Sequence, residues 1–228
     1  MELIKKRGII IFWILLVVDC YFILSNDSQY RWGSKLLLMP VLTIYLFTNA
    51  RKNYHRTYKL YIFLAMLFAW IGDALLLLKS EKAFLFGVGA FLLMHVMYIL
   101  IFYKIKPLRL NKLPQEAVIA TVVMLFGSIQ LFKFINPELG SLKIPVVVYM
   151  VFIGIMAVLA ANTLSSSGRK SLALGHFLPG AILFVISDSV LAIDKFRFNE
   201  PFLSVVVMLS YGYAQCLLME GYTKMIKG

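Results

Sequence analysis

Residues 83–103 read AFLFGVGAFLLMHVMYILIFY, a run of 21 residues without a single Asp, Glu, Lys or Arg. As an α-helix, this run would be about 31 Å long, which is close to the thickness of the hydrocarbon core of a bilayer. A chain that crosses hydrocarbon must satisfy its own backbone hydrogen bonds, and a helix does so within one segment. The run therefore predicts a transmembrane helix.

Seven further apolar stretches of similar length lie elsewhere in the 228 residues. The eight expected spans are residues 9–25, 34–50, 58–78, 83–103, 115–132, 144–164, 172–193 and 201–223. The composition agrees, with 61% hydrophobic and only 15% charged residues, and the connections leave no room for a soluble domain. The sequence predicts an all-α polytopic membrane protein, with residues 1–228 as a single integral membrane domain. We expect the inner membrane in a bacterium, or an endomembrane such as the endoplasmic reticulum in a eukaryote.

The basic residues indicate how the chain is oriented. A net charge of +12 would suggest nucleic-acid binding in a polar protein, but here the basic residues lie mostly between the apolar runs. Of the 23 Lys and Arg residues, 15 fall on the side that holds both termini and 8 on the other. Because basic residues are enriched in cytoplasmic loops, both termini are predicted to be cytoplasmic, and no nucleic-acid partner is expected.

The first apolar run also has a feature of secretory signal peptides. Lys5, Lys6 and Arg7 precede it, as in the positively charged start of such a peptide. The run leads into residues 18–21, VDCY, without a small-x-small cleavage site, and apolar residues continue to Leu24. A first membrane helix is therefore favoured.

Three acidic residues, Asp19, Asp73 and Asp188, lie several residues inside predicted spans, whereas the basic residues fall in loops or near span ends. A charged residue at the centre of a membrane helix costs about 2.5–3.5 kcal/mol on insertion scales, and it usually faces the bundle interior or a cavity. Asp19 is close to the polar residues 25–27, so we interpret it as a helix cap or a hydrated interfacial residue. For Asp73 and Asp188 a functional role is favoured.

Asp73 and Asp188 are predicted to lie at the same depth. Asp73 lies six residues before Lys79, and Asp188 lies six residues before Asp194. At about 1.5 Å per residue, both aspartates are therefore about 9 Å below the non-cytoplasmic boundary. With no basic side chain expected inside the membrane, burial and mutual repulsion would keep a proton on at least one of them. A protonated acid beside an ionised one can act as a general acid.

Polar and aromatic residues form stripes on two predicted helices. The first stripe consists of Phe91, His95, Tyr98 and Phe102. The second consists of Ser204, Met208, Tyr211, Gln215 and Tyr222. Such stripes are more typical of helix packing than of chemistry, because buried Tyr, His and Gln find partners on neighbouring helices.

Other candidate groups give weaker signals. His176, shortly before Pro179-Gly180, is interpreted as an interfacial residue at a loosened helix start. The three histidines show no metal-ligand spacing, so neither a metal nor a cofactor is expected. Cys20 and Cys216 lie inside apolar segments and do not indicate a disulfide framework.

The chain shows a trace of internal duplication. Asp73 and Asp188 are separated by 115 residues, and Tyr98 and Tyr213 follow them at the same distance of 25 residues. The two segments run in the same direction, which suggests a parallel four-plus-four repeat and not an inverted transporter repeat. Chance matches between apolar helices are common, so this repeat is a hypothesis.

Four segments together resemble a known family. They are IGDALLLL at 71–78, GVGAFLLMHVMYILIFY at 87–103, GAILFVISDSVLAI at 180–193 and YGYAQCLL at 211–218. In this order they resemble the YhhN membrane proteins, which include the eukaryotic transmembrane protein 86 lysoplasmalogenases. The resemblance extends from about residue 34 to residue 220.

This resemblance implies hydrolysis of the vinyl ether bond of 1-alkenyl lysophospholipids, with release of a fatty aldehyde and glycerophosphoethanolamine or glycerophosphocholine. Catalytic roles are implied for Asp73 and Asp188. Substrate-binding roles are implied for His95, Tyr98, Ser187, Tyr211 and Gln215. Family members often have Lys directly before the proline of the second span, where this chain has Met39-Pro40. Lys35, one turn away, is the candidate to contact a phosphate instead.

The implied reaction suits a pair of carboxyl groups. An enol ether is hydrolysed by protonation of its β-carbon, and water then captures the oxocarbenium as a hemiacetal that collapses to aldehyde and alcohol. One carboxyl can donate the proton while an ionised partner stabilises the cation, as in glycosidases. Which aspartate is the acid stays open at this point.

His95 sets a geometric condition on a shared site. If its helix starts at Ala83, His95 lies about 18 Å below the boundary, about twice the depth of Asp73. A shared site therefore predicts that the embedded part starts near Gly87, with residues 79–86 as a loop or shallow turn.

Two other classes of function stay open. Intramembrane carboxylates also form ion sites, so a small proton-coupled transporter is one alternative, although parallel symmetry disfavours the common carrier designs. A lipid-binding or structural membrane protein is the other. The enzyme is favoured, with a lysophospholipid substrate and membrane lipids as its partners.

Overall fold

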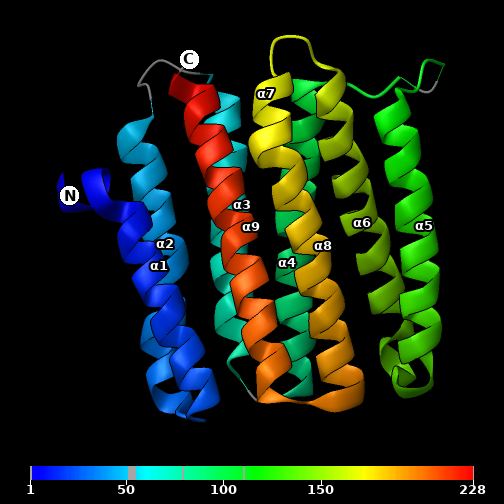
Figure 1. The fold of residues 1–228 in the computed structure, drawn as a ribbon. Coiled ribbons are helices and arrows are strands. Elements are labelled where there is room, and N and C mark those ends of the chain that lie inside the picture. Colours follow the sequence, from blue (N-terminus) through cyan, green and yellow to red (C-terminus); the bar gives the residue numbers. More distant parts are fainter. Residues whose placement is uncertain (1, 51–54, 79, 110, 228) are drawn as a thin grey trace.

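The computed structural model describes residues 2–50, 55–78, 80–109 and 111–227, which form a bundle of long helices (Figure 1). The long helices are α1 (Glu2–Leu24), α2 (Ser28–Asn49), α3 (Arg56–Leu76), α4 (Glu81–Ile105), α5 (Gln115–Ile135), α6 (Lys143–Asn162), α8 (Leu178–Ile193) and α9 (Pro201–Lys227). Short 3-10 turns connect some of them, namely η1 (Asn136–Glu138), η2 (Gly140–Leu142) and η3 (Thr163–Ser165). The predicted all-α polytopic fold is confirmed. Arg51, Lys52 and Lys79, which entered the charge count, lie outside the described residues.

The seventh predicted span is one continuous helical rod with a wide turn near its start. It comprises α7 (Lys170–Leu172), the π-helical turn η4 (Ala173–Phe177) and α8. Pro179 has no N–H to donate to a carbonyl in the preceding turn, and a π turn accommodates the missing bond. The loosening predicted near Pro179 thus takes the form of a π turn that contains His176.

The same rod extends past its predicted end at residue 193. A second π turn, η5 (Asp194–Phe198), continues it, and Asn199 ends it in the left-handed conformation with φ 58°. Asp194 is buried and accepts hydrogen bonds from the Glu200 backbone N–H at 2.7 Å and from the Ser204 hydroxyl at 2.9 Å. Asp194 therefore belongs to the packed junction with α9 and does not mark the boundary of the span.

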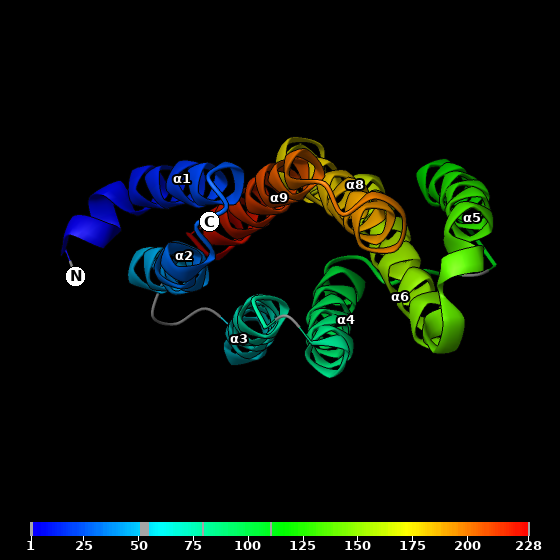
Figure 2. The same ribbon diagram turned by 90° about the horizontal axis from the view of Figure 1, so that it is seen from below.

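Seen along the helix axes, the bundle has two sides (Figure 2). On one side α1, α9 and α8 follow one another, and on the other α2, α3 and α4 do so, while α6 closes one end and α5 lies outermost beside it. In the most apolar stretch of α5 only 6% of the residues are buried, whereas in that of α9 the buried share is 50%. Helix α9 is therefore the central packing element, and α5 presents most of its surface to lipid.

Helix α2 differs from the other long helices. In the described part of the chain, seven helices are long and apolar enough to cross a membrane, and α2 does not reach that threshold. It begins at Ser28, before the predicted start at residue 34, so its first eight residues include Arg31 and Lys35. Both side chains turn inward and meet carboxylates of neighbouring helices. The expectation that no basic side chain is embedded is therefore wrong.

The described ends of α1 and α9 lie on the same side of the bundle, as an even number of crossings requires (Figure 1). Which side faces the cytoplasm stays a prediction from the basic residues. The parallel repeat also stays a prediction. Its two tyrosines have different surroundings, since Tyr98 is fully buried whereas Tyr213 is 47% exposed beside Trp13.

Candidate active site

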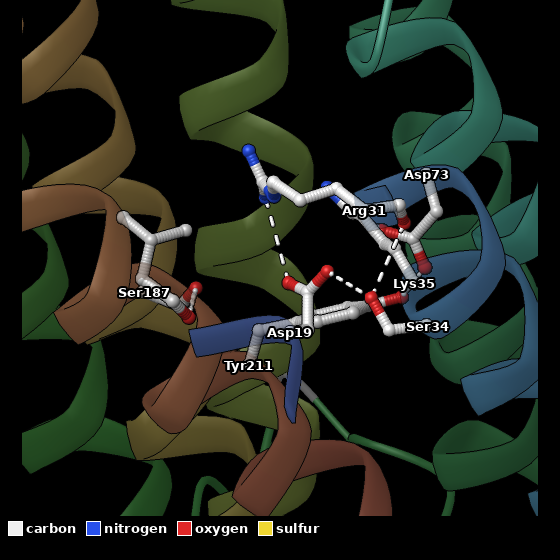
Figure 3. Close-up of polar contacts among 8 residues, drawn as sticks. Asp19, Arg31, Ser34, Lys35, Asp73, Ser187 and Tyr211 are labelled. Atoms are coloured by element: carbon white, nitrogen blue, oxygen red, sulfur yellow. Dashed lines mark hydrogen bonds and ion pairs between the residues drawn. The ribbon is translucent and has the colours of Figure 1, made fainter. Parts of the chain in front are cut away.

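One group of buried polar side chains joins α2, α3 and α9 around Asp73 (Figure 3). One carboxylate oxygen, Oδ1, is 3.5 Å from the Lys35 ammonium, and the other, Oδ2, accepts a 2.8 Å hydrogen bond from the Tyr211 hydroxyl. Both charged residues are buried, with exposed fractions of 1% for Asp73 and 6% for Lys35. Each carboxylate oxygen thus has a partner, as a charge inside a protein requires.

Beside this group, Asp19 of α1 pairs with residues at the start of α2. Its carboxylate lies 3.5 Å from the Arg31 guanidinium and accepts a 2.9 Å hydrogen bond from the Ser34 hydroxyl (Figure 3). Asp19 is fully buried, so its interpretation as a cap or a hydrated interfacial residue is wrong. The reason is the early start of α2, which brings Arg31 back across the turn at residues 25–27 to the level of Asp19.

The second group joins α4, α6 and α8 around Asp188. Its Oδ2 atom accepts a 2.6 Å hydrogen bond from the Tyr149 hydroxyl and lies 3.2 Å from Nε2 of His95. The same His95 nitrogen is 3.0 Å from the Tyr149 oxygen. With the Tyr149 hydroxyl donating to Asp188, the His95 tautomer that carries its proton on Nε2 can donate to both oxygens.

His95 reaches Asp188 although α4 begins at Glu81, not near Gly87 as a shared site would require. His95 lies 14 residues into α4, about 21 Å along its axis. The rod that contains Asp188 extends ten residues beyond it to Phe198, about 15 Å. This extension, which was not predicted, lets His95 and Asp188 meet deep in the bundle.

The two aspartates belong to separate groups, because among the described residues no hydrogen bond joins their carboxyl groups. Aromatic rings connect the two sides instead. The Tyr211 ring, beside Asp73, packs edge-on against Phe184 with 5.6 Å between centroids, and Phe184 in turn lies 5.2 Å from the His95 ring. That the two carboxyl groups act together at one site therefore stays a prediction.

An apolar cavity of about 210 Å³ borders the Asp188 group and lies between α4, α5, α6 and α8. Among the described residues that line it, Asp188 is the only acidic one, and Tyr149 lines it as well. The side chain of Asp188 is 14% exposed, whereas that of Asp73 is 2% exposed. Hydrogen bonds in the described chain reach only Oδ2 of Asp188, which leaves Oδ1 for a molecule in the cavity.

The other predicted binding residues lie in the packed interior. The Tyr98 hydroxyl donates a 2.7 Å hydrogen bond to the Gln215 side-chain oxygen, and both residues are fully buried. Ser187 donates to the Val207 carbonyl at 3.1 Å and stands apart from the charged side chains in Figure 3. These residues hold α4, α8 and α9 together. The four residues of the predicted α4 stripe, with His95 and Tyr98 among them, are all buried.

Sequence reasoning missed Tyr149 and the inward role of Arg31. A usable signal existed for Tyr149, because it is the only residue with a hydrogen-bonding side chain between Lys143 and Asn162. In the described part of the chain, no three His, Cys, Asp or Glu residues are grouped so that they could hold a metal ion.

These features define a multi-pass integral membrane protein with a carboxylate on an apolar cavity inside its helix bundle. The chain belongs to the YhhN family, whose model matches residues 30–222. No solved structure matches the chain.

Among its relatives, the chain is 31% identical to "Lysoplasmalogenase TMEM86A" of Bos taurus, over 87% of this chain and 82% of that protein. It is 30% identical to "Lysoplasmalogenase TMEM86B" of Rattus norvegicus, over 89% of this chain and 79% of that protein. It is also 33% identical to "Lysoplasmalogenase" of Mycobacterium tuberculosis, where the match covers 69% of this chain and 58% of the relative.

Proposed function

We propose that the protein is a lysoplasmalogenase, which hydrolyses the vinyl ether bond of 1-alkenyl lysophospholipids, and that Asp188 exchanges protons with the substrate. The names of the relatives support the reaction. The observation that carries the site is the position of Asp188, the one acidic group on the wall of an apolar cavity inside the bundle. An enol ether needs an acid of this kind, and its alkenyl chain needs apolar surroundings.

The reaction then proceeds in three steps at Asp188. The protonated carboxyl donates its proton to the β-carbon of the vinyl ether, and the ether oxygen shares the resulting positive charge as an oxocarbenium. Water adds to the α-carbon, and the carboxylate takes up the proton that this water loses. The hemiacetal transfers its hydroxyl proton to the glycerol oxygen as the bond between them breaks, which yields the fatty aldehyde and the lysolipid head group.

His95 and Tyr149 orient the acid in this mechanism. Both interact with Oδ2, so the carboxyl plane is held while Oδ1 stays open to the cavity. A positioned acid contributes about 10²- to 10⁴-fold to the rate. Two hydrogen-bond donors at Oδ2 also stabilise the carboxylate that remains after protonation of the substrate.

Asp73 has a different role in this proposal. Its charge is compensated by Lys35, and Tyr211 connects it to Phe91, whose ring lines the cavity and lies 5.8 Å from the Tyr211 ring. We propose that Asp73 positions the cavity wall, and that Lys35 serves Asp73 and not a substrate phosphate. Tyr98, Ser187, Tyr211 and Gln215 act as supports of the same packing.

The cavity accommodates only part of the substrate. Its volume of about 210 Å³ corresponds to roughly seven water-sized groups at about 30 Å³ each. The vinyl ether and the first methylene groups therefore fit inside, and the rest of the tail lies in the surrounding lipid.

The test is release of fatty aldehyde from lysoplasmenylethanolamine by detergent-purified protein. We expect Asp188→Asn to lower kcat by about 10²- to 10⁴-fold without loss of folding. Asp27→Asn, which changes an exposed carboxylate in the α1–α2 turn, is the matched control and should retain full activity. Hydrolysis that survives Asp188→Asn would overturn the assignment of the acid. Inactive wild-type protein that moves protons into liposomes in an Asp188-dependent way would favour the transporter.

A further inference from the structure

A second pocket lies at the opposite end of the bundle from the α1–α2 turn, where α4 ends, α5 begins and α6 ends. Its volume is about 490 Å³, and it is lined by Lys106, Pro107, Arg109, Lys112, Leu113, Pro114, Asn162 and Ser165. The basic residues predict that this end faces the cytoplasm. The reaction proposed above does not use this pocket.

The pocket has an uncompensated positive charge. Three of its lining residues, Lys106, Arg109 and Lys112, are basic, and none of the described residues that line it is acidic. None of the three forms an ion pair with a residue in the described chain. Elsewhere the structure does compensate basic side chains, as Lys35 with Asp73 shows. An anion is therefore the ligand that these side chains suit.

One wall of the pocket is built by a buried amide. Asn162 is fully buried, and its Nδ2 donates a 2.8 Å hydrogen bond to the Lys106 carbonyl, which fixes the point where the chain leaves α4. Its Oδ1 has no hydrogen-bond partner in the part of the chain that the structure describes. Ser165 donates its hydroxyl proton to the Asn162 carbonyl at 2.8 Å, so its oxygen also remains an acceptor. Asn162 and Ser165 thus offer hydrogen-bond acceptors, and Lys106, Arg109 and Lys112 offer positive charges.

We propose that this pocket binds a phosphoester that also carries a hydroxyl or ammonium group. The phosphate interacts with Arg109, Lys112 and Lys106, and the hydroxyl or ammonium donates to Asn162 and Ser165. A glycerophosphate group has this combination, and it occurs both in the head group of an anionic phospholipid and as a free solute. The choline head group lacks a hydrogen-bond donor and does not fit.

The test measures binding to detergent-purified full-length protein by isothermal titration calorimetry. The probes are dihexanoyl phosphatidylglycerol, dihexanoyl phosphatidylcholine and glycerol 3-phosphate. Each basic residue near a membrane surface contributes about fivefold to the affinity for an anionic lipid, so the double variant Arg109→Gln, Lys112→Gln should bind phosphatidylglycerol about 25-fold more weakly. Both side chains are exposed, so the fold should be retained. Lys170→Gln, an exposed basic residue at the same end but outside the pocket, is the matched control and should bind like wild type.

The outcomes separate the two sources of the phosphoester. If glycerol 3-phosphate binds and the double variant weakens its binding, a free solute suffices. If only phosphatidylglycerol shows this behaviour, the ligand is a lipid head group. The proposal is wrong if the double variant binds like wild type, if Lys170→Gln weakens binding equally, or if phosphatidylcholine binds as tightly as phosphatidylglycerol.

Discussion

The ion pair between Lys35 and Asp73 allows a quantitative test of how α2 is held in the bundle. Lys35→Met removes the ammonium that lies 3.5 Å from the carboxylate and leaves Asp73 buried with only the Tyr211 hydroxyl. Breaking a buried pair by removal of one partner costs about 3–5 kcal/mol. For a chain of this size, that loss corresponds to a fall in Tm of about 6–20 °C. Asp73→Leu alone should cost a similar amount, because it leaves the ammonium unpaired.

The double variant Lys35→Met, Asp73→Leu distinguishes a charge effect from a packing effect. Replacing both charges with apolar groups is often nearly neutral, so the double variant should be more stable than either single variant. The assay is thermal unfolding in detergent, followed by tryptophan fluorescence, with Lys82→Met at an exposed position of α4 as control. The reasoning fails if Lys35→Met melts like the control, or if the two single effects simply add in the double variant.

Three further substitutions test the site. Tyr149→Phe removes a hydrogen bond to the proposed catalytic carboxylate. It should lower kcat for aldehyde release by about 10- to 100-fold while the protein stays folded. An unchanged kcat would show that this bond is dispensable. Gly127 lines the cavity and has no described atom within 4 Å of an added Cβ, so Gly127→Leu should narrow the cavity and reduce kcat/KM. Gly89→Leu, at an exposed position with equal space but outside the cavity lining, should not. Equal activity of these two variants would contradict a role for the cavity. Gly72→Ala places a Cβ 2.7 Å from the Phe91 ring and should cost about 1–3 kcal/mol of stability, so an unchanged Tm would refute this close packing.

The spans could be predicted because the bilayer imposes a simple rule on length and composition. Residues 83–103 needed no information about their neighbours, and α4 indeed covers them. Helix ends were harder to predict, because they depend on local bonds that composition does not encode. The extension to Phe198 relies on a π turn and on Asp194 capping the next helix, and neither has a hydropathy signature.

The candidate site was only partly predictable for a related reason. A buried carboxylate is conspicuous in an apolar helix, so Asp73 and Asp188 were identified as unusual from the sequence. Their partners depend on which helices become neighbours, and pairwise packing cannot be read from single-helix patterns. Lys35 and Tyr149 each lie on a helix far from their carboxylate in sequence, so both pairings became visible only in the folded bundle.

The charges of α2 have a consequence for how the protein is made. Helix α2 carries two basic side chains into the bundle, and the acids that compensate them are on α1 and α3. During synthesis, Asp19 is available before Arg31 emerges, but Asp73 is not yet made when Lys35 reaches the membrane. The pairing of Lys35 with Asp73 can therefore form only after α3 has been made, whereas the pairing of Arg31 with Asp19 needs only α1 and α2.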